Sequence, residues 1–326
     1  MKPRTEPDIV IHRRRDRDGL PVNDRRLARQ LAKGTYERVA PGSYAPGRAW
    51  RALSPMDRHA VRVVETADRA RGRLLISHFA AAALWGIDLI GDWPETVDVI
   101  VPRTTGGRSS GMLRRRTSAR THIETVDWRG HELTTPAQTA LDLARIGSFS
   151  AGVIALDGAR WRRREGGCLT TLADLERIAI SDTEVRGHRR MRAALAFSTD
   201  LSDSVRESEG RVLIDRLGFP APVLQRRFVL PSGRSAYPDY YFEDHDHAAE
   251  FDGTGKYFDP RLRKGRTAEQ VLLAEKDRGD ELRRLVRAFS RWRTAAHEDP
   301  RLLYDILTGA GLPARRPRPP AGLVWR

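Results

Sequence analysis

The stretch YPDYYFEDHDHAAEFDGTGKY, residues 237–257, determines how the C-terminal third of this chain is interpreted. It places Asp239, Glu250, Asp252 and Lys256 on a predicted strand, a polar turn and a second strand. Acidic residues are poor strand formers, so carboxylates at the end of an apolar strand need a reason. Hard cations such as Mg²⁺ take oxygen ligands, commonly one or two carboxylates together with substrate phosphates. The spacing therefore suggests a site for a divalent metal.

The segments around this stretch predict a helix, three strands, a helix and a strand, in that order. Apolar residues repeat with a helical period before the stretch, and short apolar runs are separated by proline and glycine turns. The expected elements are a helix over 202–217, strands over 223–230, 235–242 and 248–251, a helix over 267–285, a strand over 285–292 and a closing helix over 299–307.

This order resembles the α-β-β-β-α-β core of the PD-(D/E)xK nuclease family, and most specifically its Vsr-like branch. The resemblance covers about a third of the chain, residues 201–312. Its carriers are S-x-x-x-x-E-S at 202–208, Pro-Asp at 238–239, EFDG…KY at 250–257, AEK-x-R at 274–278 and Arg-Trp at 291–292. The resemblance implies a Mg²⁺- or Mn²⁺-dependent endonuclease that hydrolyses phosphodiester bonds in DNA.

Within that resemblance, Asp239 and Glu250 are the expected metal ligands. Asp252 lies two residues after Glu250 and points to the same side of a regular strand. It stands where the family usually has lysine, and Lys256 would then supply that charge. Asp252 is alternatively a third metal ligand.

Other charged residues complete the expected site. Glu207 matches the helical acid of the family, whereas Glu209 would point about 200° away on the same helix. Lys276 and Arg278 could hold phosphates. Two further interpretations stay open: an acidic hairpin paired with arginines in an inactive fold, and a zinc site at His245 and His247.

Residues 19–55 predict a small DNA-binding module. A helix capped by Asn23 or Asp24 ends at Gly34, and two short strands follow around a turn at 41–42. The pattern resembles the winged-helix domain of AbiEi-type antitoxins. That resemblance implies DNA contacts by basic side chains of the helix, although a packing module with solvated charges is the alternative. These side chains are Arg25, Arg26, Arg29 and Lys33.

The remaining segments contain fewer residues with a predicted function. Residues 1–18 are expected to be a flexible basic arm, and residues 313–326 a tail rich in proline and arginine. Residues 56–200 predict an α/β domain that resembles the region after the winged helix in AbiEi-like proteins. His78, which follows Ser77 at the start of an apolar helix, is expected to be structural.

Composition limits the class of protein. The 326-residue chain has a net charge of +15, and only five of its 58 basic residues are lysines. Such an excess favours polyanionic partners, nucleic acid above all, although a merely basic solvated surface is the alternative. The one cysteine, Cys168, excludes an internal disulfide. No membrane span or secretory signal is expected, so the predicted location is the cytoplasm.

Two functions follow from these patterns. The first is a metal-dependent endonuclease targeted by its N-terminal DNA-binding module, in repair or defence. The alternative is a non-catalytic DNA-binding regulator of the antitoxin type, with a degenerate nuclease fold and a cognate toxin. RNA processing is a weaker third reading. The expected fold class is α/β, in an α+β multidomain arrangement.

Overall fold

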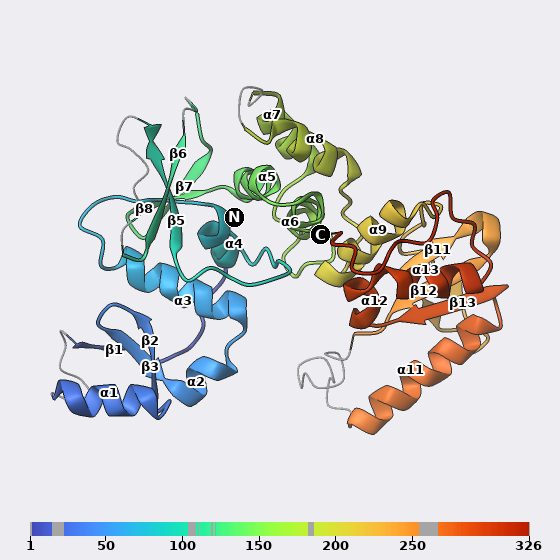
Figure 1. The fold of residues 1–326 in the computed structure, drawn as a ribbon, viewed down its shortest axis with the longest axis horizontal. Coiled ribbons are helices and arrows are strands. Elements are labelled where there is room, and N and C mark those ends of the chain that lie inside the picture. The colour runs from blue at the N-terminus through green and yellow to red at the C-terminus, as the bar shows by residue number, and fades with distance from the viewer. Residues whose placement is uncertain are drawn as a thin grey trace. The chain divides into compact units, whose positions relative to one another are not determined.

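A computed structural model describes residues 2–14, 23–103, 109, 111–118, 120, 122–181, 186–253 and 267–325 (Figure 1). The chain has mixed α/β structure, which confirms the predicted class. It divides into two compact units, Met1–Ser198 and Thr199–Arg326. Lys256, which was predicted to replace the lysine of the nuclease motif, lies outside the described residues.

The N-terminal unit begins with a small sheet and a helix. Its strands are β1 (His12–Arg13), β2 (Tyr36–Ala40) and β3 (Ser43–Pro46), in the order β1-β3-β2 and antiparallel. The predicted helix is α1 (Asp24–Ala32), in which the side chain of Asn23 accepts a hydrogen bond from the amide of Arg25 at 2.8 Å. The predicted hairpin turns at Gly42, whose φ of +72° suits glycine.

Residues 2–14, expected to form a flexible arm, contact the rest of this unit. Ile9 and Ile11 pack against a core cluster that contains Trp50. Arg13 forms an ion pair with Glu65 at 2.5 Å. The apolar residues of the arm therefore provide anchors that composition alone did not suggest.

A larger sheet follows in the same unit, with the strand order β6-β5-β4-β8-β7. Pairs β5–β6 and β4–β8 are parallel, whereas β4–β5 and β7–β8 are antiparallel. The strands are β4 (Leu75–Ile76), β5 (Val97–Pro102), β6 (Leu113–Ser118), β7 (Thr125–Trp128) and β8 (His131–Thr134).

Helices accompany this sheet, and α4 contacts both β5 and α5. Helix α5 starts with Pro136, and the side chain of the preceding Thr135 caps it by accepting from the amide of Gln138. The helices of the unit are α2 (Gly47–Ala52), α3 (Pro55–Ala67), α4 (His78–Trp85), α5 (Pro136–Ile146), α6 (Phe149–Arg160), α7 (Leu172–Ser181) and α8 (His188–Phe197).

The C-terminal unit is built around a sheet of order β11-β12-β13. Strands β11 (Tyr240–Phe242) and β12 (His247–Phe251) are antiparallel, and a turn of 3-10 helix (Glu243–His245) joins them. The chain then passes through α11 (Ala268–Arg283) and returns as β13 (Ala288–Trp292), parallel to β12. A parallel pair needs a long crossover of this kind.

The strands predicted over 223–230 and 235–242 are shorter than expected. The first is reduced to β9 (Phe228–Val229), and the second is divided into β10 (Ser235–Ala236) and β11. Strands β9 and β10 pair as a separate hairpin, and Val223 makes a single bridge to Tyr241. Proline lacks an amide donor and interrupts a ladder, and Pro222, Pro231 and Pro238 bound these segments.

Helix α9 (Val205–Leu217) packs closely on this sheet. A Cβ at Gly210 would lie 2.3 Å from the hydroxyl of Tyr240, so only glycine allows this approach. That hydroxyl donates to the carbonyl of Glu207 at 2.8 Å. Helices α12 (Thr294–Glu298) and α13 (Pro300–Gly309) complete the unit.

The segment predicted to be a tail also contacts the C-terminal unit. Trp325 is buried, and its indole Nε1 donates to the carbonyl of His297 at 2.7 Å. Arg216 of α9 donates to the carbonyl of Trp325 at 2.6 Å. Residues far along the sequence from α9 therefore pack against it.

Candidate functional site

The three carboxylates singled out from the sequence meet at the C-terminal end of β12. Asp239 precedes β11, and its Oδ2 accepts a hydrogen bond from the amide of Phe251 at 2.7 Å. Glu250 belongs to β12 itself. Asp252 follows β12, and its amide donates to the carbonyl of Trp292 at 2.7 Å. Pairing of the strands thus brings together residues that the sequence separates.

Both carboxylate oxygens of Glu250 form ion pairs with arginine side chains. Arg278 of α11 lies 2.9 Å from Oε1, and Arg291 of β13 lies 2.6 Å from Oε2. The Glu250 side chain is only 7% exposed. Two guanidinium groups thus face one buried carboxylate, so both oxygens of Glu250 already have cationic partners.

Asp252 is also paired with an arginine. Nε of Arg293 lies 3.2 Å from its Oδ2. Most of the Arg293 side chain is exposed, so this ion pair contributes little on its own.

The carboxylates of this arrangement already have other partners. Both oxygens of Glu250 face guanidinium groups, and an oxygen of Asp239 accepts from the backbone. Across the described ranges, no group of three or more His, Cys, Asp or Glu side chains is placed to hold a metal ion. A Mg²⁺ or Mn²⁺ site formed by Asp239, Glu250 and Asp252 stays a prediction.

Glu207 caps its own helix. Its Oε2 accepts from the amide of Asp203 and its Oε1 from the hydroxyl of Ser204, both at 2.9 Å. The same hydroxyl accepts from the amide of Glu207 at 3.2 Å. This reciprocal pattern satisfies donors at the helix start, as in a capping box. These hydrogen bonds give Glu207 a structural role at the start of α9.

The sequence did not reveal a buried network centred on His297. Nδ1 of His297 lies 2.8 Å from Oε2 of Glu209, and the indole of Trp292 donates to Nε2 at 3.0 Å. Since Nε2 accepts, the proton of a neutral ring sits on Nδ1 and is donated to Glu209. Glu209 also pairs with Arg206 at 2.8 Å. Glu209, expected to point away from the site, therefore links α9 to α12 and β13.

The two histidines considered as zinc ligands, His247 and His245, lie in β12 and in the turn before it. His247 is buried in β12, and its Nε2 lies 2.9 Å from the hydroxyl of Ser290. Burial lowers the pKa of His247 to about 4, so the ring is neutral at physiological pH. His245 lies in the turn before β12.

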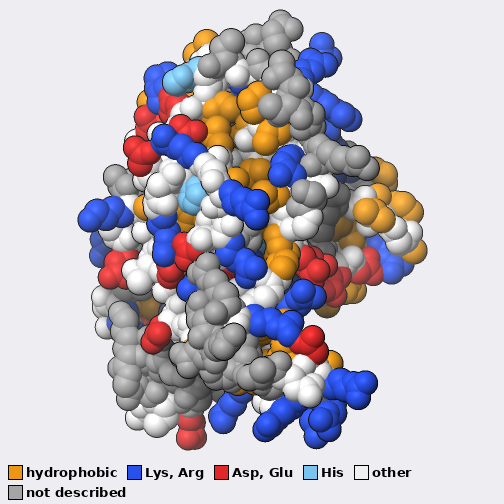
Figure 2. All heavy atoms as spheres, turned by 90° about the vertical axis from the view of Figure 1, so that its left-hand side faces the viewer, with side chains coloured by type: hydrophobic (Ala, Val, Ile, Leu, Met, Phe, Trp, Pro, Cys, Tyr) orange, Lys and Arg blue, Asp and Glu red, His pale blue; other side chains and the backbone are white. Residues whose placement is uncertain are grey.

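The residues predicted to contact DNA from α1 are all exposed. The acidic side chain of the helix, Asp24, pairs with Arg14. Figure 2 shows Lys and Arg side chains gathered in the lower part of one face, the height at which Figure 1 draws α1. The exposed basic residues of the helix are Arg25, Arg26, Arg29 and Lys33.

The two basic residues predicted on α11 differ from each other. Lys276 is exposed, whereas Arg278 is partly buried against Glu250. Only Lys276 is presented to solvent in a way that suits contact with a phosphate.

Comparison with known proteins gave no match, either to protein-family models or to curated proteins. The resemblances to AbiEi-like and PD-(D/E)xK proteins therefore rest on the quoted motifs. No helix in the described ranges combines the length and the apolar character needed to cross a membrane.

Proposed function

We propose that this protein is a DNA-binding regulator whose C-terminal unit has a nuclease-like arrangement without metal-dependent cleavage. The proposal of DNA binding rests on helix α1. Four basic side chains of this helix are exposed, and none of them forms an ion pair with another described residue. Exposed cations on one helix suit contacts with the phosphate backbone of DNA.

The pairing of Glu250 supports a role without cleavage. A carboxylate that holds a catalytic cation needs free oxygen lone pairs, yet Arg278 and Arg291 each bond one oxygen of Glu250. Removing these guanidinium groups would leave charged groups without partners, which is costly in a buried position. A cognate toxin is implied by the AbiEi resemblance alone and stays a prediction.

The proposal of DNA binding is tested by changing α1. The variant with Arg25, Arg26, Arg29 and Lys33 all replaced by alanine should bind duplex DNA more weakly. Each lost phosphate contact reduces the slope of log K against log[salt] by roughly 0.9, so the loss of four contacts should reduce it by about 3.6. Fluorescence polarisation over a series of salt concentrations measures it.

A matched control removes the same charge from exposed positions elsewhere in the N-terminal unit. In this control, alanine replaces Arg71, Arg162, Arg189 and Arg192. The slope should change much less in the control. Equal slopes in the α1 variant and the unaltered protein would end the assignment of α1 as the DNA-binding element.

A metal-dependent endonuclease is the second candidate, and the position of Asp239 favours it. The hydrogen bond from Phe251 holds Asp239 beside the end of β12 that carries Glu250. The test is incubation of the full chain with supercoiled, mismatched and single-stranded DNA, with Mg²⁺ or Mn²⁺. The regulator proposal predicts no cleavage. Cleavage abolished by Asp239→Ala, with DNA binding retained, would establish the endonuclease instead.

A further inference from the structure

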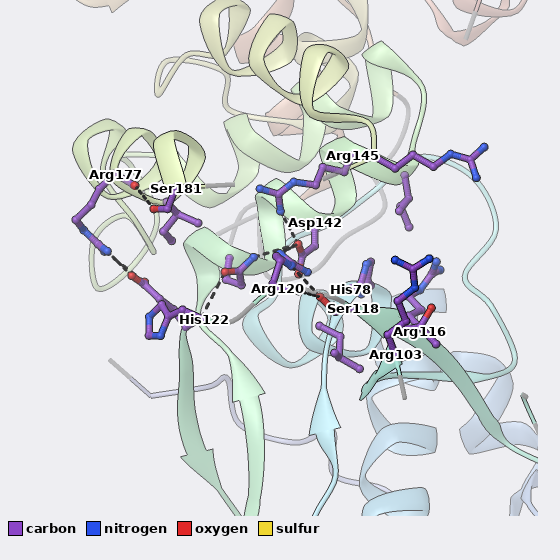
Figure 3. Close-up of a pocket in the computed structure, with 17 residues that line it drawn as sticks. His78, Arg103, Arg116, Ser118, Arg120, His122, Asp142, Arg145, Arg177 and Ser181 are labelled. Atoms are coloured by element: carbon purple, nitrogen blue, oxygen red, sulfur yellow. Dashed lines mark hydrogen bonds and ion pairs between the residues drawn. The ribbon is translucent and has the colours of Figure 1, made fainter. Parts of the chain in front are cut away.

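The N-terminal unit contains a pocket that sequence analysis did not identify. Its volume is about 820 Å³, within the range of small-molecule sites. Figure 3 shows side chains from β6, α5 and α7 directed toward it, together with His78. Apolar side chains, those of Ile100, Ile146 and Ile178, line the pocket beside charged and polar ones. The pocket therefore suits a ligand that has both an apolar part and a polar part.

His78, the first residue of α4, lines the pocket in an unusual backbone conformation. Its φ is +49°, which is uncommon for a residue other than glycine. Backbone strain of this kind concentrates at ligand sites. The residue is only 5% exposed, and its ring faces the pocket, although the sequence had suggested a merely structural role.

One nitrogen of this buried ring is available to a ligand. Nδ1 of His78 lies 2.9 Å from the hydroxyl of Ser77, whereas Nε2 has no hydrogen-bond partner within the described ranges. Burial lowers the pKa of His78 to about 4, so the ring is neutral at physiological pH. When the hydroxyl of Ser77 donates to Nδ1, the proton of the neutral ring lies on Nε2 and is free to be donated into the pocket.

Arg116 of β6 also lines the pocket, and Figure 3 labels it beside His78. Its Nε donates to Oδ1 of Asp98 at 2.8 Å, and its two terminal nitrogens bond no residue that the structure describes. The side chain is 24% exposed. A guanidinium group fixed through Nε keeps two parallel N–H donors, and this geometry matches the two oxygens of a carboxylate.

The charge of Arg116 is only partly balanced. Asp98 is fully buried, and it pairs with Arg114 at 2.6 Å as well as with Arg116. Within the part of the chain that the structure describes, none of these three side chains forms another ion pair. Two guanidinium groups thus share one carboxylate, and a single negative charge on a ligand would balance the group.

We propose that this pocket binds an organic monocarboxylate with an apolar body. Arg116 pairs with the carboxylate through its two terminal nitrogens, His78 donates to it from Nε2, and the three isoleucines contact the apolar body. The carboxylate carries one negative charge, which is the charge that balances the group around Asp98. An amide of the same shape lacks this charge, so it should bind much more weakly.

The residues that line the pocket do not include α1, so the tests are independent of DNA binding. Isothermal titration of the full chain compares phenylacetate with phenylacetamide, and hexanoate with hexanamide. In at least one pair the acid should bind roughly ten-fold more tightly than its amide, or better, because hydrogen bonds to a charged group are the stronger ones. Acetate, which lacks the apolar body, measures unspecific attraction to a basic protein and should bind more weakly than that acid. No preference for either acid, or acetate that binds as tightly, would overturn the proposal.

Two variants locate the binding. Arg116→Gln removes the guanidinium group and leaves Asp98 paired with Arg114. His78→Asn removes the imidazole, and asparagine tolerates a positive φ. Each variant that circular dichroism shows to be folded should lose most of the preference for the acid. The control, Arg192→Gln, makes the same substitution at an exposed position outside the pocket and should keep the preference.

A preference that survives in folded Arg116→Gln would overturn the assignment to this pocket. Crystals of the unaltered chain grown with the acid that binds test the same assignment without a variant. The carboxylate is expected within hydrogen-bond distance of the terminal nitrogens of Arg116 and of Nε2 of His78. Density for the acid only elsewhere on the protein, or an empty pocket at a saturating concentration, would also overturn it.

Discussion

Single residues in this protein show a recurring arrangement, in which two arginines share one buried carboxylate. Asp98, Asp142 and Glu250 are each buried and each face two guanidinium groups. Burial alone would raise the pKa of Asp142, but His78 and the guanidinium groups lower it below its ordinary value. The pKa of Asp98 is likewise below its ordinary value, so Asp98 and Asp142 stay charged at neutral pH.

The first prediction concerns Asp142. Asp142→Asn removes the carboxylate that Arg120 and Arg145 share, which should reduce the free energy of unfolding by about 3–5 kcal/mol. Urea unfolding measures the loss. Arg120→Gln is the comparison, because it leaves Asp142 paired with Arg145 and should cost less. Equal losses in the two variants would contradict this account.

The second prediction concerns pH. Burial lowers the pKa of both His78 and His247 to about 4, below the unfolded value of about 6.5. Between these values the unfolded chain binds more protons than the folded chain, so stability falls as the pH decreases from about 6.5 to 4. Each histidine should contribute a loss of up to ~3 kcal/mol.

Urea unfolding at pH 7 and at pH 4.5 measures this loss. His247→Gln removes one titrating group and retains an amide that can bond Ser290, so its stability should depend less on pH. An unchanged pH dependence would show that His247 does not titrate as expected. Carboxylates with lowered pKa values, such as Asp98 and Asp142, affect stability at lower pH.

Among the elements, those with strong local signals were predictable from sequence. Asn23 caps the helix that it was expected to begin, and Gly42 turns the expected hairpin. Strand β6, with the sequence LRRRTS, was missed because three consecutive arginines do not resemble a strand. Its position depends on Asp98, a distant partner that local patterns cannot reveal.

The candidate site was predictable only in part, for a related reason. The sequence indicated that Asp239, Glu250 and Asp252 belong together, because short strands and a turn separate them. The pairing of Glu250 with Arg291 depends on the parallel register of β12 and β13, which are 41 residues apart at this point. Such a register is set by tertiary packing. The sequence left open a hairpin whose acids pair with arginines, but only the structure identified Arg278 and Arg291 as the partners of Glu250.

A prediction at the scale of elements concerns the contact of α9 with β11. A Cβ at Gly210 would lie 2.3 Å from the hydroxyl of Tyr240, which is fully buried and hydrogen-bonded. Gly210→Ala should therefore destabilise the C-terminal unit by about 1–3 kcal/mol through overpacking. Thermal unfolding, followed by tryptophan fluorescence, measures the effect.

The control is Gly309→Ala at the end of α13, where an added Cβ meets no atom within 4 Å. Alanine is a better helix former than glycine, so this change should be neutral or slightly stabilising. If Gly210→Ala were as stable as the control, the close approach of α9 would not limit the fold.

Across the whole molecule, the basic residues behind the net charge of +15 differ in their surroundings. Many arginines are paired with carboxylates, as in the interior of both units, and these contribute to structure. Others, such as Arg25, Arg26 and Arg29 of α1, face solvent. Composition predicts a polyanionic partner from the total, but only the distribution distinguishes arginines that stabilise the fold from those that could contact DNA.

The position of Trp325 also affects how the protein is made. A ribosome synthesises the N-terminal unit first, and every residue of that unit precedes Thr199. The C-terminal unit instead needs Trp325, whose indole and carbonyl bond His297 and Arg216. At 5–20 residues per second, translation from Thr199 to Trp325 takes roughly ten seconds. During that interval the nascent C-terminal unit lacks a residue that is buried in its folded form, so its folding cannot be completed before Trp325 is added.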